Sequence, residues 1–454
     1  MEQRKYHIAM FPWFAFGHMT PFLHLSNELA NRGHTISFLL PKKAQAQLQL
    51  SNLHPNLISF HTVTVPTVSG LPSGTETASD IPLSLNHLLI TAMDQTRDQL
   101  EEILKPLKPD FVFYDFAHWI PQLGSKIGFK SINYIVVCVA AIAIAVVPAL
   151  EICKDRPLPE KLVEPPPGYP SATVVFRRHE AARSLAFING ESGSGVTFYE
   201  RIAAALKESD AIAVRTCQEL EGRLCEYLHA QYGKPVHLTG PVLPESDKTP
   251  LEERWARWLS KFDPRSVVFC ALGSQWVLEK EQFQELALGL ELTGRPFLAA
   301  VKPPLGVATV EEALPEEFKE RIKGRGEIYG GWVQQTQILN HPSIGCFVTH
   351  AGFGSMWEGL ISEPGIVLLP HLGDQILNTR LLGDELKVGV EVERDENGRF
   401  WKEGVCLAIE KVMDEGGEVG RRVKKNHAKW RETLGSQGFM SGYIDKFIEK
   451  LHEL

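Results

Sequence analysis

The sequence lacks several features that would assign it to other classes of protein. Its 454 residues include seven cysteines, an odd number, and none forms a C-x-x-C pair, so neither a zinc site nor a redox motif is indicated. The 47 Lys and Arg are outnumbered by 55 Asp and Glu, for a formal net charge of −8, and no basic stripe is present. We therefore expect reduced thiols in a cytoplasmic protein without a nucleic-acid partner.

Long hydrophobic runs are also missing. The longest, Ile135 to Leu150, carries Pro148 near its end and falls short of the roughly 20 apolar residues that a bilayer-spanning helix needs. This run predicts a buried helix or a pocket wall instead of a membrane span. The N-terminal apolar run is too short for a signal peptide and is typical of a first β-strand.

The sequence does contain a regular alternation of short apolar strands and amphipathic helices, over a length that suits two domains. This alternation predicts the α/β class, with two doubly wound, Rossmann-like domains facing each other. A segment with three prolines and mixed charges indicates where the first domain ends. The predicted divisions are a first domain at 1–240, a linker at 241–252, a second domain at 253–435 and a C-terminal helix at 436–454 that packs back on the first.

The first domain is expected to open with a strand at 6–13, then a helix, then a strand at 35–40. Thr20 is a plausible N-cap of this helix and Pro21 suits its first position, after which apolar residues recur at helical spacing. Further buried strands are predicted at 110–114, 131–137 and 211–214, and in the second domain at 267–272, 297–301, 346–349, 366–370 and 388–392.

A glycine-rich turn at 349–355, THAGFGS, follows one of these strands and opens a helix. Backbone N–H groups at such a helix start attract anions, and glycines let a phosphate approach closely. His350 and Ser355 add donors, and Glu358 one turn further on suits a ribose hydroxyl pair. Neither a P-loop nor the dinucleotide fingerprint is present, because Trp357 occupies the third glycine position. A tight turn that holds no ligand fits this feature, taken alone, equally well.

Two further loops follow strands of the same half. Leu272-Gly273-Ser274 offers backbone N–H groups and a hydroxyl, which could reach the same diphosphate as the glycine-rich turn at 349–355 if that turn binds one. Asp374-Gln375 offers a carboxylate and an amide, which suit sugar hydroxyls, at a strand end where ligands bind in such sheets. Each is a common short sequence, and a turn without a ligand remains the alternative reading of both.

Taken together, the residues from Trp332 to Gln375 resemble the signature box of plant UDP-dependent glycosyltransferases of secondary metabolism, which are family-one enzymes of the GT-B fold. The spacing holds without insertion, and the resemblance extends along the whole chain. It implies that Trp332 stacks on the uracil of the donor, that Val333 meets the edge of the base, and that Gln335 and Glu358 hold the ribose. The resemblance also implies that Asp374 and Gln375 hold the sugar. The implied diphosphate contacts are Ser274, His350, Gly352, Gly354 and Ser355.

Two departures from the family pattern concern the donor. The family has Trp-Asn-Ser where this chain has Phe353-Gly354-Ser355, and Cys where it has Ala351. Loss of the asparagine removes a phosphate donor, and loss of the tryptophan reshapes the sugar end of the pocket. The terminal Gln375 favours glucose as the donor sugar, with UDP-rhamnose and UDP-xylose as alternatives.

The resemblance also supplies a catalytic pair, which spacing alone does not. His18 lies beside the first helix and Asp115 ends a strand, and both match the family's catalytic positions. A histidine oriented by a carboxylate is a competent general base for an alcohol. The implied reaction is inverting: His18 removes the acceptor proton and the oxygen attacks the anomeric carbon opposite UDP. No metal ion or other cofactor is expected.

The acceptor is inferred from an aromatic-rich N-terminal segment. Phe14 and Phe16 are predicted to face the acceptor, with packing against the neighbouring helix as the alternative. The segments FPWFAFGHMTPFLHLSNELANRGH, GFGSMWE and PHLGDQILNTRLL resemble the branch that extends flavonoid or terpenoid glycosides, similar to flavonoid 3-O-glucoside 2''-O-glycosyltransferases. The nucleophile is then a sugar hydroxyl, with an aglycone hydroxyl as the alternative.

Two rival functions remain, and both fit the same fold. A nucleotide-dependent oxidoreductase would need the dinucleotide fingerprint, which is missing. A non-catalytic carrier of apolar small molecules would have no use for His18 and Asp115 beside a largely intact nucleotide box. A monomer is the expected state.

Overall fold

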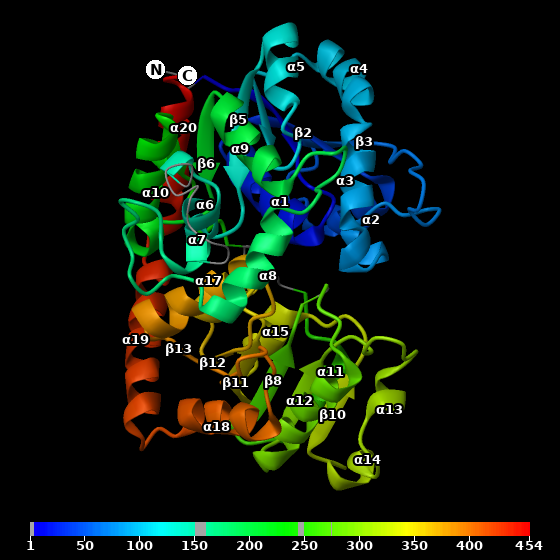
Figure 1. Ribbon diagram of the computed structural model, residues 1–454, viewed down its shortest axis with the longest axis vertical. Helices are drawn as coiled ribbons and strands as arrows, with labels where there is room; N and C mark the ends of the chain where they lie inside the picture. The colour runs from blue at the N-terminus through cyan, green and yellow to red at the C-terminus, as the bar shows by residue number, and fades with distance from the viewer. Residues whose placement is uncertain (1–3, 150–159, 244–248, 274) are drawn as a thin grey trace. The chain divides into compact units, whose positions relative to one another are not determined.

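The computed structural model describes residues 4–149, 160–243, 249–273 and 275–454. The chain forms two compact units, and each is α/β with one wholly parallel sheet, which confirms the predicted fold class (Figure 1). Neither unit is contiguous in sequence. Unit 1 consists of Met1–Ala172, Ala181–Leu243 and Gly438–Leu454, and unit 2 of Thr173–Glu180 and Pro244–Gln437.

Unit 1 is built on a seven-stranded parallel sheet. Its strands are β1 (His7–Phe11), β2 (Thr35–Leu40), β3 (Ile58–Thr62), β4 (Phe111–Tyr114), β5 (Lys130–Ile135), β6 (Ala211–Val214) and β7 (Val236–Leu238). Across the sheet the order is β3-β2-β1-β4-β5-β6-β7. Alternate positions of β1 serve two cores: Ile8 and Met10 pack on one face, and Ala9 and Phe11 on the other.

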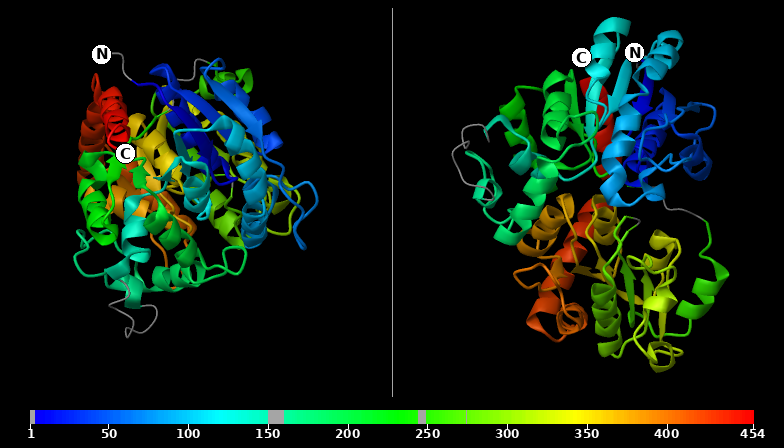
Figure 2. Two further views of the ribbon diagram at one scale, coloured as in Figure 1. Left: turned by 90° about the horizontal axis from the view of Figure 1, so that it is seen from above. Right: turned by 45° about the vertical axis from the view of Figure 1, so that its right-hand side comes forward.

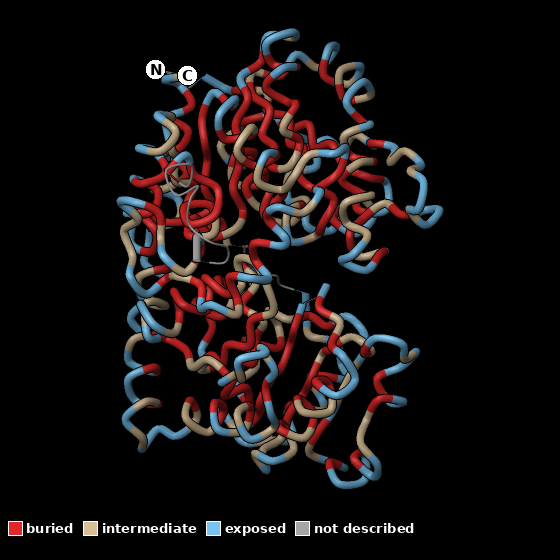
Figure 3. Tube along the Cα trace, viewed as in Figure 1, coloured by how far each residue is buried: buried red, intermediate tan, exposed pale blue. Residues whose placement is uncertain are grey.

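Helices of unit 1 cover both faces of this sheet, and the strands in the middle of the sheet are largely buried, whereas the outer strands β3 and β7 are partly exposed (Figure 3). The helices are α1 (Phe16–Asn31), α2 (Lys42–Leu48), α3 (Asn86–Asp94), α4 (Arg97–Leu107), α5 (Ile120–Ile127), α6 (Val139–Ala145), α7 (Glu160–Val163), α9 (Phe198–Glu208), α10 (Gln218–Tyr232) and α20 (Phe439–Leu451), together with the part of α8 (Arg178–Ile188) that follows Glu180. Phe22 of α1 and Phe447 of α20 share one core, so the C-terminal helix helps to close that face. Leu89 of α3 and Leu100 of α4 lie in the other core.

The beginning and the end of the described chain meet at one edge of unit 1, where the C-terminal helix is drawn in red (Figure 2). The Tyr6 hydroxyl and His452 Nδ1 are hydrogen-bonded, and Arg32 donates to Asp445 at 2.5 Å. The linker predicted at 241–252 falls around the boundary between the units. Val242 is buried in the core of unit 1, and residues 244–248 lie outside the described residues.

Unit 2 repeats the design with a six-stranded parallel sheet. Its strands are β8 (Val267–Ala271), β9 (Phe297–Ala300), β10 (Gly326–Tyr329), β11 (Ile344–Thr349), β12 (Gly365–Leu368) and β13 (Gly389–Glu391), in the order β10-β9-β8-β11-β12-β13. The helices are α11 (Glu253–Leu259), α12 (Lys280–Leu292), α13 (Val310–Ala313), α14 (Phe318–Arg321), α15 (Gln335–Leu339), α16 (Phe353–Ile361), α17 (Asp374–Arg380), α18 (Lys402–Met413) and α19 (Glu418–Gly435), with a π-helical turn at Leu381–Glu385.

Helix α1 begins earlier than the sequence predicts. Its first residue is Phe16, after the N-cap Ala15, so the prediction of Thr20 as cap and Pro21 as first residue is wrong. Pro21 lies inside the helix and cannot donate to the carbonyl of Gly17. Gly17 is exposed, so water can bond that carbonyl and lower the cost of an internal proline. As a result His18 lies in the first turn of a helix.

The long apolar run is partly a buried helix, as predicted. Within 135–149, helix α6 buries nearly all its side chains, and Leu150 lies outside the described residues. Within the described parts of the chain, no helix is both long enough and apolar enough to cross a bilayer.

Candidate functional site

Unit 1 brings His18 and Asp115 together from two elements that are far apart in sequence. His18 lies in the first turn of α1, and Asp115 follows β4, which pairs with β1 in parallel register. His18 Nδ1 lies 2.7 Å from Asp115 Oδ2, and the side chains are 19% and 8% exposed. With Nδ1–H donating to the carboxylate, the proton is on Nδ1 and Nε2 carries a lone pair.

The orientation of the Asp115 carboxylate is fixed by its other oxygen. Oδ1 accepts the backbone N–H of Trp13 at 2.7 Å and the backbone N–H of Phe116 at 2.6 Å. Only Oδ2 is therefore directed at the histidine. The backbone carbonyl of Asp115 in turn accepts from the Asn133 amide at 3.1 Å. A carboxylate held in this way can orient the imidazole and stabilise its protonated form.

A row of aromatic rings extends from His18. The Phe116 ring packs edge-on against the imidazole with 5.6 Å between centroids, and Phe198 packs on Phe116 at 5.7 Å. Phe187 follows at 4.7 Å from Phe198, and 46% of its surface is exposed. These three rings could not be predicted as a group from the sequence, because they lie in separate segments of the chain. The FYDF sequence around Asp115 was the one available signal.

The two predicted acceptor residues are placed differently. Phe14 has no exposed surface, and its ring packs edge-on against Phe11 at 5.8 Å between centroids. This burial favours a packing role for Phe14 in the present conformation. Phe16 is partly exposed and packs against the core on the α1 face of the sheet.

Unit 2 places the glycine-rich turn between the end of β11 and the start of α16, with Gly352 as the N-cap. Two glycines lie directly against the His350 imidazole. A Cβ added to Gly352 would be 2.5 Å from Nε2, and one added to Gly273 would be 2.7 Å from the same atom. Burial lowers the pKa of His350 to about 4. The imidazole is therefore neutral at pH 7 and able to donate a single N–H beside a helix start.

The glycine-rich turn is held by the buried side-chain amide of Asn378, which was not among the predicted site residues. Ala351 adopts a positive φ of 58°. Its carbonyl accepts from Asn378 Nδ2 at 2.8 Å, and the same nitrogen lies 3.2 Å from Asp374 Oδ2. Asn378 thus connects the glycine-rich turn to the first residue of α17. The spacing of four between Asp374 and Asn378 on one helix face was a signal that could have found it.

Three predicted ribose and phosphate residues form one cluster. The Gln335 amide nitrogen donates to Ser355 Oγ at 3.1 Å and also to Glu358 Oε2. Just before it, Trp332 is 77% exposed, whereas Val333 is buried in the core beside β8 and β11. The exposed indole is free to stack on a planar group, and Val333 can offer only its backbone to a ligand.

The remaining predicted residues lie around these groups. Gln375 Oε1 accepts the backbone N–H of His371 at 3.0 Å, and the His371 ring stacks on Trp276 at 4.7 Å between centroids. A Cβ added to Gly354 would meet nothing within 4 Å, so space is open where the related enzymes carry an asparagine. The predicted phosphate contact Ser274 lies outside the described residues.

One α/β unit contains a glycine-lined helix start, an exposed tryptophan and a Gln–Ser–Glu cluster, and the other carries a His–Asp pair. This combination is the one expected of a nucleotide-sugar-dependent glycosyltransferase, and the comparisons with known proteins show that class. Residues 200–419 match the family described as UDP-glucoronosyl and UDP-glucosyl transferase. The chain belongs to this family of UDP-glycosyltransferases, as its similarity to full-length members also shows.

Two relatives illustrate that similarity. UDP-glycosyltransferase 79B6 of Arabidopsis thaliana is 55% identical over 99% of this chain and 98% of its own length. The anthocyanidin 3-O-glucoside 2'''-O-xylosyltransferase of the same plant is 55% identical over 100% of this chain and 98% of its own.

Solved structures share the fold. UGT73P12 of Glycyrrhiza uralensis, complexed with glycyrrhetinic acid 3-O-monoglucuronide, gives a TM-score of 0.81 at 22% identity, covering 99% of this chain and 96% of that one. UGT89C1 of Arabidopsis thaliana, complexed with UDP-L-rhamnose, gives a TM-score of 0.76 at 23% identity, covering 99% of this chain and 100% of that one. At these identities the likeness extends to the fold alone.

Proposed function

We propose that this UDP-glycosyltransferase transfers glucose from UDP-glucose, with inversion, to a sugar hydroxyl of a flavonoid glycoside or a similar apolar plant glycoside. In the transfer, a bond forms between the acceptor oxygen and the anomeric carbon. The bond from that carbon to the diphosphate breaks, and UDP leaves with the electron pair. The acceptor proton passes to the protein.

The 2.7 Å contact between His18 Nδ1 and Asp115 Oδ2 carries the proposal. Because Asp115 accepts a hydrogen bond from Nδ1–H, the proton stays on Nδ1 and Nε2 is the basic nitrogen, and no described residue forms a hydrogen bond with Nε2. Nε2 would receive the acceptor proton as the oxygen attacks, and Asp115 would stabilise the resulting imidazolium. The proposal assigns no step to a metal ion.

Unit 2 would hold the donor. The exposed Trp332 indole would stack on the uracil, and Glu358, oriented by Gln335, would accept from ribose hydroxyls. The N–H groups at the start of α16, with neutral His350 and Ser355, would stabilise the charge that grows on the diphosphate. Asp374 and Gln375 at the start of α17 would bind sugar hydroxyls.

The acceptor surface would be the aromatic row that starts at the base. Phe116 packs on His18, Phe198 packs on Phe116, and Phe187 packs on Phe198, so the three rings offer a row of apolar faces. Such faces suit the fused rings of a flavonoid. A relative that is 55% identical over the full chain is named for adding a sugar to an anthocyanidin 3-O-glucoside, which supports a glycoside as the acceptor.

Xylose is the second candidate donor sugar, because that same relative is named a xylosyltransferase. Glucose is favoured by Gln375 at the end of the signature box. The two donors differ by one hydroxymethyl group at C5 of the ring. A hydroxymethyl group makes a modest difference in binding, so the preference must be measured with both donors present.

The test is a product mass from a competition. The enzyme is mixed with equal UDP-glucose, UDP-xylose and UDP-rhamnose and, in two separate reactions, with a flavonol or with its 3-O-glucoside. The expected product carries one hexose more than the 3-O-glucoside. A pentose increment would assign xylose, and a deoxyhexose increment would assign rhamnose. A product from the free flavonol alone would contradict the glycoside acceptor.

A further inference from the structure

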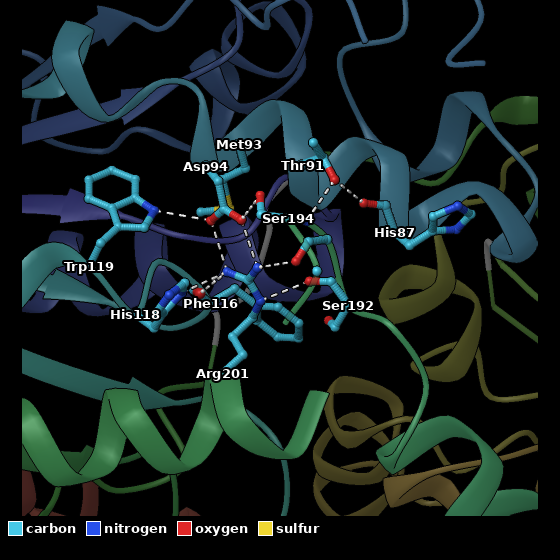
Figure 4. A network of polar contacts seen from close by, with 12 residues as sticks. His87, Thr91, Met93, Asp94, Phe116, His118, Trp119, Ser192, Ser194 and Arg201 are labelled. Atoms are coloured by element: carbon cyan, nitrogen blue, oxygen red, sulfur yellow. Dashed lines mark hydrogen bonds and ion pairs between the residues drawn. The ribbon is translucent and has the colours of Figure 1, made fainter. Parts of the chain in front are cut away.

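A buried arginine of unit 1 lies at the centre of a polar network that includes the segment after β4 (Figure 4). Arg201 of α9 has no exposed surface, and its guanidinium forms a two-pronged ion pair with Asp94, the last residue of α3. The two N–O distances are 2.9 and 2.7 Å. Both members of the pair are largely withdrawn from water, with Asp94 only 11% exposed.

Every nitrogen of the Arg201 guanidinium has a fixed acceptor. Nε donates to the Ser192 carbonyl at 2.9 Å, and Nη2 donates to the Gly193 carbonyl at 3.2 Å. Nη1 reaches the Phe116 carbonyl at 3.2 Å and His118 Nδ1 at 2.9 Å. A planar fork with five donors can connect several segments in this way, whereas an ammonium group cannot.

Asp94 collects donors from the same segments. It accepts Trp119 Nε1–H at 3.1 Å and the Ser194 hydroxyl at 2.7 Å, in addition to Arg201. Trp119 is the residue that precedes α5, so the segment from β4 to α5 is attached to this ion pair at both ends. A buried ion pair is costly to desolvate and contributes little net stability compared with apolar packing. Its many directed contacts indicate a role in geometry.

The connection to the proposed base runs through a single residue, Phe116. Its N–H donates to Asp115 Oδ1 at 2.6 Å, and its carbonyl accepts from Arg201. Its ring packs against the His18 imidazole. The arginine therefore holds Phe116 at its carbonyl, while the N–H on the other side of the same residue holds the Asp115 carboxylate and its ring packs on the histidine.

We propose that Arg201, paired with Asp94, is a positioning residue for the His18–Asp115 pair. The proposal rests on the function assigned above to that pair, but its geometry can be tested separately. The Phe116 carbonyl also accepts the His118 backbone N–H at 2.9 Å, and Asp115 Oδ1 also accepts the Trp13 N–H. Loss of the fork would remove the side-chain donor to Phe116, loosen this residue and weaken the bond between the Asp115 carboxylate and His18 Nδ1. Among the described residues, those of unit 2 that are proposed to bind the donor form no contact with Arg201 or Asp94.

Arg201→Lys in the full-length protein is the decisive variant, because it keeps the positive charge and removes the fork. Arg215→Lys is the matched control. Arg215 is also buried in unit 1 and donates to backbone carbonyls, at 2.7 Å to Pro241 and 3.4 Å to Val242, away from the segment after β4. Both changes cost stability, so a general loss of folding would affect both.

Two readouts separate positioning from folding. The first is the downfield proton NMR signal of the His18 Nδ1–H, identified by its absence in His18→Ala. The second is the split between kcat and the dissociation constant for UDP. For Arg201→Lys we expect loss or broadening of the signal, a fall in kcat of about tenfold or more, and UDP affinity within about twofold of wild type. For Arg215→Lys we expect the signal and kcat to persist.

Retention of both the signal and kcat in Arg201→Lys would overturn the proposal, and so would equal losses in Arg215→Lys. If Arg201→Lys does not fold, Trp119→Phe takes its place in the same two measurements. It keeps a ring and removes one donor to Asp94, and a wild-type signal with wild-type kcat would then refute positioning. If His18→Ala keeps its rate, the proposed base is wrong, while the NMR signal still reports whether Arg201 orients the pair.

Discussion

Gly352 and His350 are packed so closely that the turn between β11 and α16 accepts no side chain at position 352. A Cβ there would lie 2.5 Å from His350 Nε2 and 3.0 Å from Cε1. The imidazole cannot easily withdraw, because Gly273 lies against it as well, with a Cβ position 2.7 Å from the same nitrogen. The position of the histidine N–H thus depends on two glycines from different loops.

Gly352→Ala is therefore expected to displace the imidazole and to weaken UDP binding by about tenfold or more, since a charge-assisted hydrogen bond is lost. Isothermal titration with UDP measures this. Gly435→Ala in the same unit is the control, because an added Cβ there meets nothing within 4 Å. Unchanged UDP affinity in Gly352→Ala would show that His350 does not contact the diphosphate.

His18→Ala is expected to lower kcat by at least about a hundredfold, the usual contribution of a general base. UDP affinity is expected to survive, because the residues proposed to bind the nucleotide belong to unit 2. Asp115→Asn tests the partner by a different route: its amide would donate to Nδ1, so the imidazole proton would move to Nε2 and the base would be lost. The comparison is made by steady-state kinetics, and near-wild-type kcat in His18→Ala would remove His18 from the mechanism.

The fold was readable from the sequence because strands of a parallel sheet are buried on both faces and appear as continuous apolar runs. The strand predicted at 211–214 coincides with β6, and that at 267–272 overlaps β8. The start of α1 was not readable. Thr20-Pro21 is a strong local start signal, but the backbone forms helical hydrogen bonds from Ala15 onward, including Met19 N–H to the Ala15 carbonyl at 2.9 Å.

Much of the candidate site was not readable either, because its contacts join distant segments. Arg201 and Asp94 are separated by 107 positions, and no periodicity connects them. The Phe198 ring, likewise, reaches Phe116 only through the packing of α9 beside the end of β4. The residues proposed to bind the donor could be selected as a group because they lie close together in sequence and match a family pattern, and their individual roles stay a prediction.

Asp374→Ala is expected to lower kcat/KM for the UDP-sugar by about 10- to 100-fold, the loss of one charge-assisted hydrogen bond to the sugar. UDP, which lacks the sugar, should bind within about threefold of wild type. Asn378→Ala is the informative comparison, because Asn378 contacts both Asp374 and the Ala351 carbonyl. Asn378→Ala should weaken the binding of UDP as well as the binding of the sugar. If Asp374→Ala lowered UDP affinity as much as kcat/KM for the UDP-sugar, Asp374 would support the glycine-rich turn instead of binding the sugar.

Acid should destabilise unit 2 through His427. Burial lowers the pKa of His427 to about 4, and its Nε2 lies 2.9 Å from the Gly359 carbonyl, so the neutral ring donates there. In the unfolded chain a histidine takes up a proton near pH 6.5. Between these values the unfolded state binds more protons, so the contribution to stability is complete above about pH 6.5 and is lost as the pH falls toward 4.

Between pH 7.5 and 5 this amounts to roughly 2 kcal/mol. His427→Gln keeps a donor for the Gly359 carbonyl and removes the titrating group. The variant should therefore lose less unfolding free energy than wild type on acidification, whatever its stability at pH 7.5. Denaturant titrations of both proteins at the two pH values measure the difference. If wild type and His427→Gln lost the same unfolding free energy on acidification, His427 would be protonated equally in the folded and unfolded states.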